Sequence, residues 1–141
     1  MGVKLPGEAP PNVKVLIVDD EASQRSGLAA MLSAWHMTPE TAADGEEALA
    51  KLATFPADVI LTDLNMPGMD GLEVTRRIRA IEQVQKRAHT PVVAVTANAD
   101  QGIREACQAA GMDGFLTKPI DPSELDSMLQ TFFEIAANAA A

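Results

Sequence analysis

The length, composition and charge of the chain limit the kinds of protein it can be. Its 141 residues, of which 47% are hydrophobic and 22% charged, fit one globular domain with a real core. The formal net charge of −9 argues against contact with nucleic acid or with an anionic membrane, because both require a basic surface. A single cysteine, no apolar run of transmembrane length and no signal-peptide pattern indicate a reducing, cytoplasmic setting.

The two ends of the chain differ in composition from the part between them. Residues 1–12 contain three prolines and two glycines, which predicts a flexible N-terminal linker. Residues 136–141 are alanine except for one asparagine, and we expect a frayed C-terminal tail there. Residues 13–135 are therefore expected to form the domain.

The first half of the chain alternates apolar runs with amphipathic segments. Residues 13–18 are apolar and β-branched, which predicts a buried strand. Residues 21–36 then predict a helix, residues 38–43 a weaker strand, residues 44–54 a helix and residues 57–63 a third strand. The inward face of the first helix is expected to carry Leu28, Met31, Leu32 and Trp35.

The second half of the chain continues this alternation. Helices are predicted over 70–85, 100–111 and 121–137, and strands over 90–97 and 112–119. In the last helix, Asp121 is the expected N-cap and Pro122 lies in the first turn. The helix over 70–85 is expected to face inward with Leu72, Val74, Ile78 and Ile81.

Five strands, each followed by a helix, predict an α/β fold. We expect a single-domain, doubly wound (βα)5 flavodoxin-like fold whose five-stranded parallel sheet has the order 2-1-3-4-5. In such a sheet, ligands bind beyond the carboxyl ends of the strands, where the strand order reverses between strands one and three.

Polar residues follow four of the predicted strands at that edge. Asp19 and Asp20 follow strand one, Asp63 ends strand three, Thr96 ends strand four and Lys118 ends strand five. A carboxylate after a strand often caps the next helix, but several acids at one edge repel one another. A bound cation would explain the cluster, and oxygen ligands without Cys or His favour Mg²⁺.

Asp63 is the candidate reactive group of this edge. It stands alone at its strand end, before a loop stiffened by Pro67 and opened by Gly68. An aspartate can act as a nucleophile toward phosphorus and form an acyl phosphate. Lys118 and the Thr96 hydroxyl would then contact the remaining phosphoryl oxygens.

Four motifs along the chain are those of a known family. VLIVDDE, DVILTDLNMPGMDG, VVAVTA and GFLTKP, in this order, resemble the receiver domain of bacterial two-component response regulators, which is CheY-like. The resemblance covers residues 13–129. It implies that Asp63 accepts a phosphoryl group, in a transfer catalysed by the receiver itself. The implied partner is a histidine kinase or a histidine phosphotransfer protein, as donor or acceptor.

The resemblance also implies the roles of the neighbouring residues. Mg²⁺ would be held by the carboxylates of Asp19, Asp20 and Asp63 and by the main-chain carbonyl of Asn65, and Lys118 would pair with Asp63. Thr96 and Phe115 would form a switch that alters the surface of the fourth helix, fifth strand and fifth helix. Neither nucleic acid nor membrane is an implied partner of this domain.

Three alternatives stay open at this point. The segment IRAIEQVQKRAHTP and the residues after it resemble receivers of hybrid sensor histidine kinases, which would place the domain in the cytosolic part of a membrane-bound kinase; a free-standing regulator is the alternative. Aspartate-nucleophile, Mg²⁺-dependent phosphohydrolases have a second aspartate where this chain has Asn65. A pseudo-receiver that only binds partners is the third class.

Four residues outside this edge are not expected to take part in the chemistry. His36 and His89 are expected to be solvated, and Met66 and Met69 are expected to pack within a loop.

Overall fold

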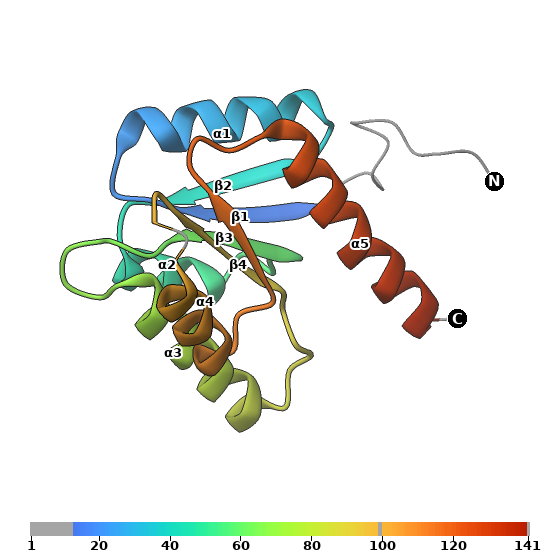
Figure 1. The fold of residues 1–141 in the computed structure, drawn as a ribbon. Coiled ribbons are helices and arrows are strands. Elements are labelled where there is room, and N and C mark those ends of the chain that lie inside the picture. Colours follow the sequence, from blue (N-terminus) through green and yellow to red (C-terminus); the bar gives the residue numbers. More distant parts are fainter. Residues whose placement is uncertain (1–12, 99, 141) are drawn as a thin grey trace.

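A central sheet of five parallel strands carries helices on both of its faces (Figure 1). The computed structural model describes residues 13–98 and 100–140, with side chains up to Phe132. The strands are β1 (Lys14–Val18), β2 (Thr38–Ala42), β3 (Val59–Asp63), β4 (Val92–Thr96) and β5 (Gly114–Thr117). The helices are α1 (Ala22–Ala34), α2 (Gly45–Leu52), α3 (Gly71–Gln85), α4 (Gln101–Ala110) and α5 (Pro122–Ala140).

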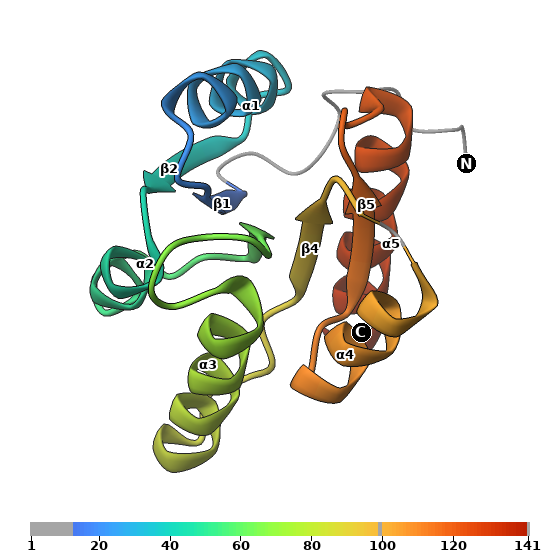
Figure 2. The ribbon, with the colours of Figure 1, turned by 60° about the vertical axis from the view of Figure 1, so that its left-hand side comes forward.

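The strand order is β2-β1-β3-β4-β5, with every neighbouring pair parallel, which confirms the predicted doubly wound fold. α1 and α5 cover one face of the sheet, and α2, α3 and α4 cover the other (Figure 2). The predicted elements all form, and most of their ends differ from the observed ones by only one or two residues.

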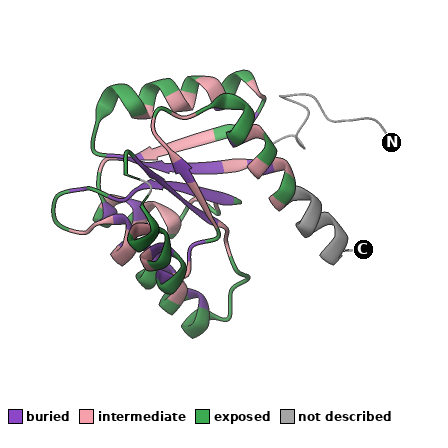
Figure 3. Ribbon diagram, in the orientation of Figure 1, coloured by how far each residue is buried: buried purple, intermediate pink, exposed green. Residues whose placement is uncertain are grey.

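The core has two layers because alternate residues of a strand point to opposite faces of a sheet. In β1, Val15 and Ile17 pack with Leu32 of α1 on one face, while Leu16 and Val18 belong to the cluster on the other. All residues of β3 and of β4 are buried, as Figure 3 shows in purple. Strands buried on both faces therefore account for the nearly continuous apolar runs in the sequence.

One predicted core position on α3 is wrong. Val74 and Ile78 are buried as expected, but Ile81 is 37% exposed, and Val84 after it is 83% exposed. The last turns of α3 extend beyond the strands that lie under its first half (Figure 1). The regular spacing of apolar residues in α3 therefore continues beyond the part of the helix that the sheet covers.

Aspartates set the starts of the later helices. Asp44, Asp70 and Asp100 accept hydrogen bonds from backbone N–H groups in the first turns of α2, α3 and α4, at 2.8 to 2.9 Å. Asp121 accepts one from the Ser123 N–H at 2.9 Å, as expected of an N-cap. Glu21, before α1, makes no such bond.

The predicted ends of the domain stay predictions. Residues 1–12, the predicted linker, lie outside the described residues, as does Ala141. The backbone of α5 continues through the predicted tail to Ala140. None of the described helices combines the length and the apolar character that crossing a bilayer requires.

Candidate functional site

The carboxyl ends of four strands meet at one edge of the sheet. Val18 of β1 pairs with Thr62 of β3, which brings the residues that follow them, Asp19 and Asp63, side by side. Thr96 of β4 pairs with Thr117 of β5, and Lys118 comes next. The structure thus brings the predicted edge residues together, although they are far apart in the sequence.

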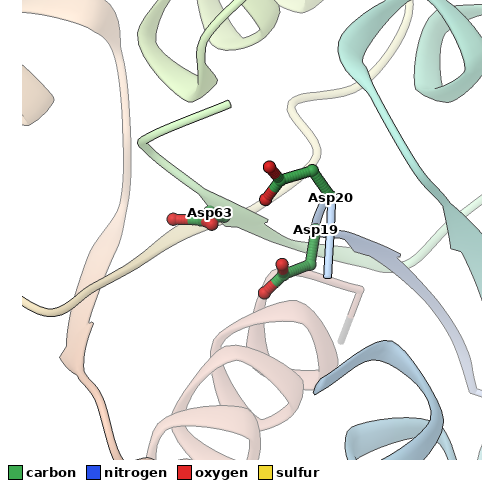
Figure 4. A group of neighbouring side chains, drawn as sticks. All are labelled: Asp19, Asp20 and Asp63. Atoms are coloured by element: carbon green, nitrogen blue, oxygen red, sulfur yellow. The ribbon is translucent and has the colours of Figure 1, made fainter. Parts of the chain in front are cut away.

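Three carboxylates form an acidic cluster at this edge (Figure 4). One carboxylate oxygen from each of Asp19, Asp20 and Asp63 lies within 4.8 Å of the others. Asp19 and Asp63 are buried, at 6% and 7% exposure, whereas Asp20 is exposed. Like charges this close are unfavourable unless a cation compensates them. The donors are hard oxygens, which fit Mg²⁺ and leave it access from the Asp20 side.

Lys118 compensates part of this charge. Its ammonium nitrogen lies 3.2 Å from Asp19 Oδ2 and 3.3 Å from Asp63 Oδ2. Burial lowers the pKa of Lys118, but its bond to Asp19 and the charges of Asp19 and Asp63 outweigh this effect and leave the pKa raised. Lys118 therefore stays positively charged at neutral pH.

The Asp63 carboxylate is held at both of its oxygens. Oδ1 accepts a hydrogen bond from the Asn65 N–H at 3.2 Å, and Oδ2 faces Lys118. Burial raises the pKa of Asp63, and the neighbouring Asp19 charge adds to this, while the Asn65 N–H and Lys118 act in the opposite direction. A carboxylate with two fixed oxygens presents a defined geometry to a reacting group.

The loop after β3 is attached closely to α3. The Gly71 N–H donates to the Leu64 carbonyl at 3.1 Å. A Cβ at Gly71 would lie only 2.4 Å from the Asp63 carbonyl oxygen, so glycine is required for this approach. Met66 is buried in the core cluster and Met69 packs against it, so both methionines attach the loop to the core rather than only packing within it.

The loop after β1 is fixed by contacts that the sequence did not reveal. The Glu21 N–H donates to Asp19 Oδ1 at 2.9 Å, and Arg25 Nη1 donates to the Asp19 carbonyl at 2.6 Å. Arg25 lies on α1, and no motif marks it because its role depends on how α1 folds back along the loop. These contacts position the first acid of the cluster.

Of the two predicted switch residues, Thr96 is buried at the site and Phe115 is half-buried nearer the surface. Thr96 is 1% exposed, and its hydroxyl accepts a hydrogen bond from the Asn98 N–H at 3.2 Å. Phe115 is half-buried and packs against the core cluster on the side of α2, α3 and α4. The Arg104 guanidinium lies 4.7 Å from the centre of the Phe115 ring.

Both histidines lie away from the acidic cluster. His36 is exposed, as expected. His89 is exposed too, but its Nε2 lies 2.7 Å from Asp113 Oδ1, so it has a partner that the sequence did not indicate. Asp113 also pairs with Arg79, which ties α3 to the loop before β5.

Residues 15–130 match the family described as the response regulator receiver domain. The chain belongs to this family. It is a CheY-like receiver domain of the kind found in two-component and phosphorelay systems, which confirms the resemblance inferred from its motifs.

Relatives of very different length share this domain. The chain is 40% identical over 120 residues to the sensor histidine kinase RcsC of Salmonella typhi, covering 85% of this chain but 12% of that protein. It is 39% identical over 126 residues to the chemotaxis protein CheY-3 of Vibrio cholerae, covering 87% and 93%. The chain therefore spans a small part of RcsC and nearly all of CheY-3.

Solved structures confirm the fold. The chemotaxis protein CheY4 of Vibrio cholerae superposes with a TM-score of 0.79 at 37% identity, over 86% of this chain and 98% of that chain. The receiver domain of Ssk1 of Saccharomyces cerevisiae, crystallised with the histidine phosphotransfer protein Ypd1, gives a TM-score of 0.84 at 25% identity, over 90% and 92%.

Proposed function

We propose that Asp63 is the phosphoacceptor of this receiver, and that the donor is a phosphohistidine on a histidine kinase or a histidine phosphotransfer protein. The observation that carries the proposal is the environment of Asp63. Its carboxylate is buried, is held by the Asn65 N–H and the Lys118 ammonium, and lies beside two further acids. A helix cap or a structural ion pair does not require this combination of groups.

The transfer is a single displacement at phosphorus. A carboxylate oxygen of Asp63 forms a bond to the phosphorus while the phosphorus–nitrogen bond of the phosphohistidine breaks, and the electron pair of that bond stays on the imidazole. Lys118, with its raised pKa, is placed to neutralise charge on the phosphoryl oxygens. The domain thus supplies positioning and charge for its own phosphorylation.

Asp19, Asp20 and Asp63, with the Asn65 carbonyl, would hold Mg²⁺. The support is the oxygen-only donor set and the closeness of the three carboxylates, within 4.8 Å. When bound, Mg²⁺ supplies positive charge that offsets both the acids and an incoming phosphoryl group. Arg25 and the Glu21 N–H keep Asp19 in place for this role.

Phosphorylation is expected to change the surface formed by α4, β5 and α5. The Thr96 hydroxyl, which accepts from the Asn98 N–H, would donate a hydrogen bond to a phosphoryl oxygen, and Phe115 would turn inward, away from Arg104. The support for a change at this surface is a hollow of about 670 Å³ beside β5 and α5, lined by residues that include Phe115, Met128 and Phe132. A new position of Phe115 would change the shape of this hollow.

The phosphodonor is expected to dock beside α1. An apolar hollow of about 320 Å³ is lined by Leu28 and Met31 of α1 and by Lys118 and Ile120 after β5. It adjoins the acidic cluster through Lys118, so a partner seated there would hold its phosphohistidine near Asp63. The complex of Ssk1 with Ypd1 supports a histidine phosphotransfer protein as one partner class.

For the whole protein, we propose a hybrid sensor histidine kinase that carries this domain in its cytoplasmic part. The support is the similarity to RcsC and to the virulence sensor protein BvgS of Bordetella bronchiseptica, which is 37% identical over 137 residues, covering 96% of this chain and 11% of BvgS. A kinase core encoded in the same reading frame would support this proposal. A reading frame that encodes this domain alone would favour a free-standing regulator.

The proposal is tested by phosphorylation with acetyl phosphate or a phosphohistidine donor and Mg²⁺, followed by intact-mass measurement. The wild-type chain should gain one acid-stable, base-labile phosphoryl group, and Asp63→Asn should gain none. Asp58→Asn is the matched control, since Asp58 lies exposed at the opposite edge of the sheet, where it accepts from the Lys14 N–H. Equal labelling of wild type and Asp63→Asn would refute the assignment. Catalytic turnover of phosphomonoesters would favour the phosphohydrolase alternative. Absence of labelling of the wild-type chain would favour the pseudo-receiver.

A further inference from the structure

The basic residues of this acidic chain are concentrated near the end of α3. The chain has 11 Lys and Arg against 20 Asp and Glu. Five of these basic residues lie within positions 76–87, where Glu82 is the only acid. They are Arg76, Arg77, Arg79, Lys86 and Arg87. A strongly basic segment in a chain of net charge −9 calls for a reason beyond solubility.

One of the five basic residues has a structural role. Arg79 donates hydrogen bonds to the Gly111 and Thr90 carbonyls and pairs with Glu82 and Asp113, at 2.8 to 3.0 Å. It is mostly buried and holds the α3–β4 and α4–β5 loops together. Its charge is thus already compensated inside the fold.

The other basic side chains are at the surface. Arg76 and Arg77 reach Glu73 through exposed contacts within α3, at 3.5 and 2.9 Å. Exposed pairs of this kind are weak and are easily exchanged for another acid. Lys86 and Arg87 are exposed where α3 ends.

Apolar side chains lie between these charges. Ile81 and Val84 are the exposed large hydrophobic residues among those the structure describes. With Arg77 they follow a spacing of four and three residues, so they share one stripe of the helix. Arg76 and Gln83 lie on the neighbouring stripe and, with Arg87 just beyond the end of α3, help to line a hollow of about 500 Å³.

This face of α3 is not covered within the domain. α2 and α4 lie beside α3, and the sheet lies beneath it (Figure 2). The last turns extend away from the sheet and are drawn as mostly exposed in Figure 3. An apolar stripe that stays uncovered, with arginines at both ends, is typical of a surface that binds a partner.

We infer that this surface (Arg76, Arg77, Ile81, Val84 and Arg87, the α3 surface) binds an acidic amphipathic helix of another protein. From Arg76 to Gln85, the last residue of α3, the helix rises about 14 Å, and Arg87 follows just beyond its end. A helix of that length with apolar residues in the middle and carboxylates at both ends complements the surface in charge and in pattern.

Charge complementarity favours a protein helix over other acidic partners. DNA or an anionic membrane would present extended negative charge to the whole chain, whose net charge is −9 and repels it. Neither would need the exposed Val84 side chain. The inference concerns a surface that the proposed phosphorylation does not use, so either can fail without the other.

The test measures binding of a labelled helical peptide to the full chain by fluorescence anisotropy. The peptide, about 15 residues long, has two leucines in the middle and glutamates at both ends. Binding should be saturable and should weaken as salt rises from about 50 to about 300 mM. Arg76→Gln with Arg87→Gln, and separately Val84→Ser, should each weaken it by about tenfold or more.

A matched control separates local charge from net charge. Ser33→Glu with Ala50→Glu makes the same change in net charge at exposed positions of α1 and α2, and should bind the peptide as the wild type does. Circular dichroism checks that each variant is folded.

Several results would overturn the inference. One is no binding of the peptide; another is an equal loss in the control variant, or equal binding of a peptide with lysines in place of the glutamates. Binding of a DNA duplex or of phosphatidylserine vesicles through Arg76 and Arg87 would assign a different occupant. A dimer of the chain that Arg76→Gln with Arg87→Gln dissolves would assign a second copy instead.

Discussion

The contact between Gly71 and the end of β3 predicts that two identical substitutions have opposite effects. In Gly71→Ala, the new Cβ would lie 2.4 Å from the Asp63 carbonyl oxygen and 3.1 Å from the Asp63 carbonyl carbon. These are backbone atoms of a buried strand, so they cannot move aside cheaply. In Gly27→Ala, on α1, no atom of the surroundings lies within 4 Å of the new Cβ.

The magnitudes follow from two competing terms. Alanine in a helix interior is favoured over glycine by about 1 kcal/mol, and Gly27→Ala should gain most of this. Overpacking against fixed atoms costs about 1–3 kcal/mol, so Gly71→Ala should be destabilised despite any gain in helix propensity. The two variants should differ by about 2–4 kcal/mol. For a chain of this size, that is a difference of roughly 6–13 °C in melting temperature.

Urea denaturation of both variants and of the wild type measures these free energies of unfolding. Since the clash falls on Asp63 itself, Gly71→Ala should also slow phosphorylation by acetyl phosphate, whereas Gly27→Ala should not. The reasoning is refuted if Gly71→Ala is as stable as Gly27→Ala, because the observed close approach would then have no energetic effect.

Three other predictions concern the acidic cluster, an internal ion-pair network and the cysteine. Asp20→Asn should weaken Mg²⁺ binding by about tenfold or more, measured as the dependence of the melting temperature on Mg²⁺; an unchanged dependence would contradict the site. Arg79→Met should lower the free energy of unfolding by about 2–3 kcal/mol in urea, since Glu82 and Asp113 lose their cation; a change near zero would count against the network. Burial raises the pKa of the Cys107 thiol, so the native chain should react slowly with a thiol reagent at neutral pH and faster as the pH rises above the usual thiol range. Reaction at the rate of an exposed thiol at neutral pH would contradict this.

The sequence was sufficient to predict the fold and the grouping of the edge residues. β1, β3 and β4 are short apolar runs, β2 and β5 are weaker, and four of the helices begin after a capping aspartate, so the alternation is visible without structure. Parallel strands direct their carboxyl ends to one edge. For that reason, the nearness of Asp19, Asp63 and Lys118 followed from topology alone.

Contacts that depend on where elements end could not be predicted. The helical spacing of apolar residues in α3 includes Ile81. This spacing does not show where the supporting sheet ends, so the prediction that Ile81 lies in the core is wrong. Arg25 donates to the Asp19 carbonyl, and His89 contacts Asp113. Both partners lie in loops whose paths are set by tertiary packing. Local sequence patterns carry no information about such pairs.

The position of Lys118 along the chain has a consequence for biosynthesis. Its ammonium joins Asp63, 55 residues earlier, and Asp19, 99 residues earlier. Closing loops of this length costs entropy that only the packed sheet repays, so the ammonium reaches the acids only when β5 has docked beside β4. A chain still emerging from the ribosome, or one whose last strand has come loose, exposes Asp63 without this cation. Competence to receive a signal would then coincide with completed folding.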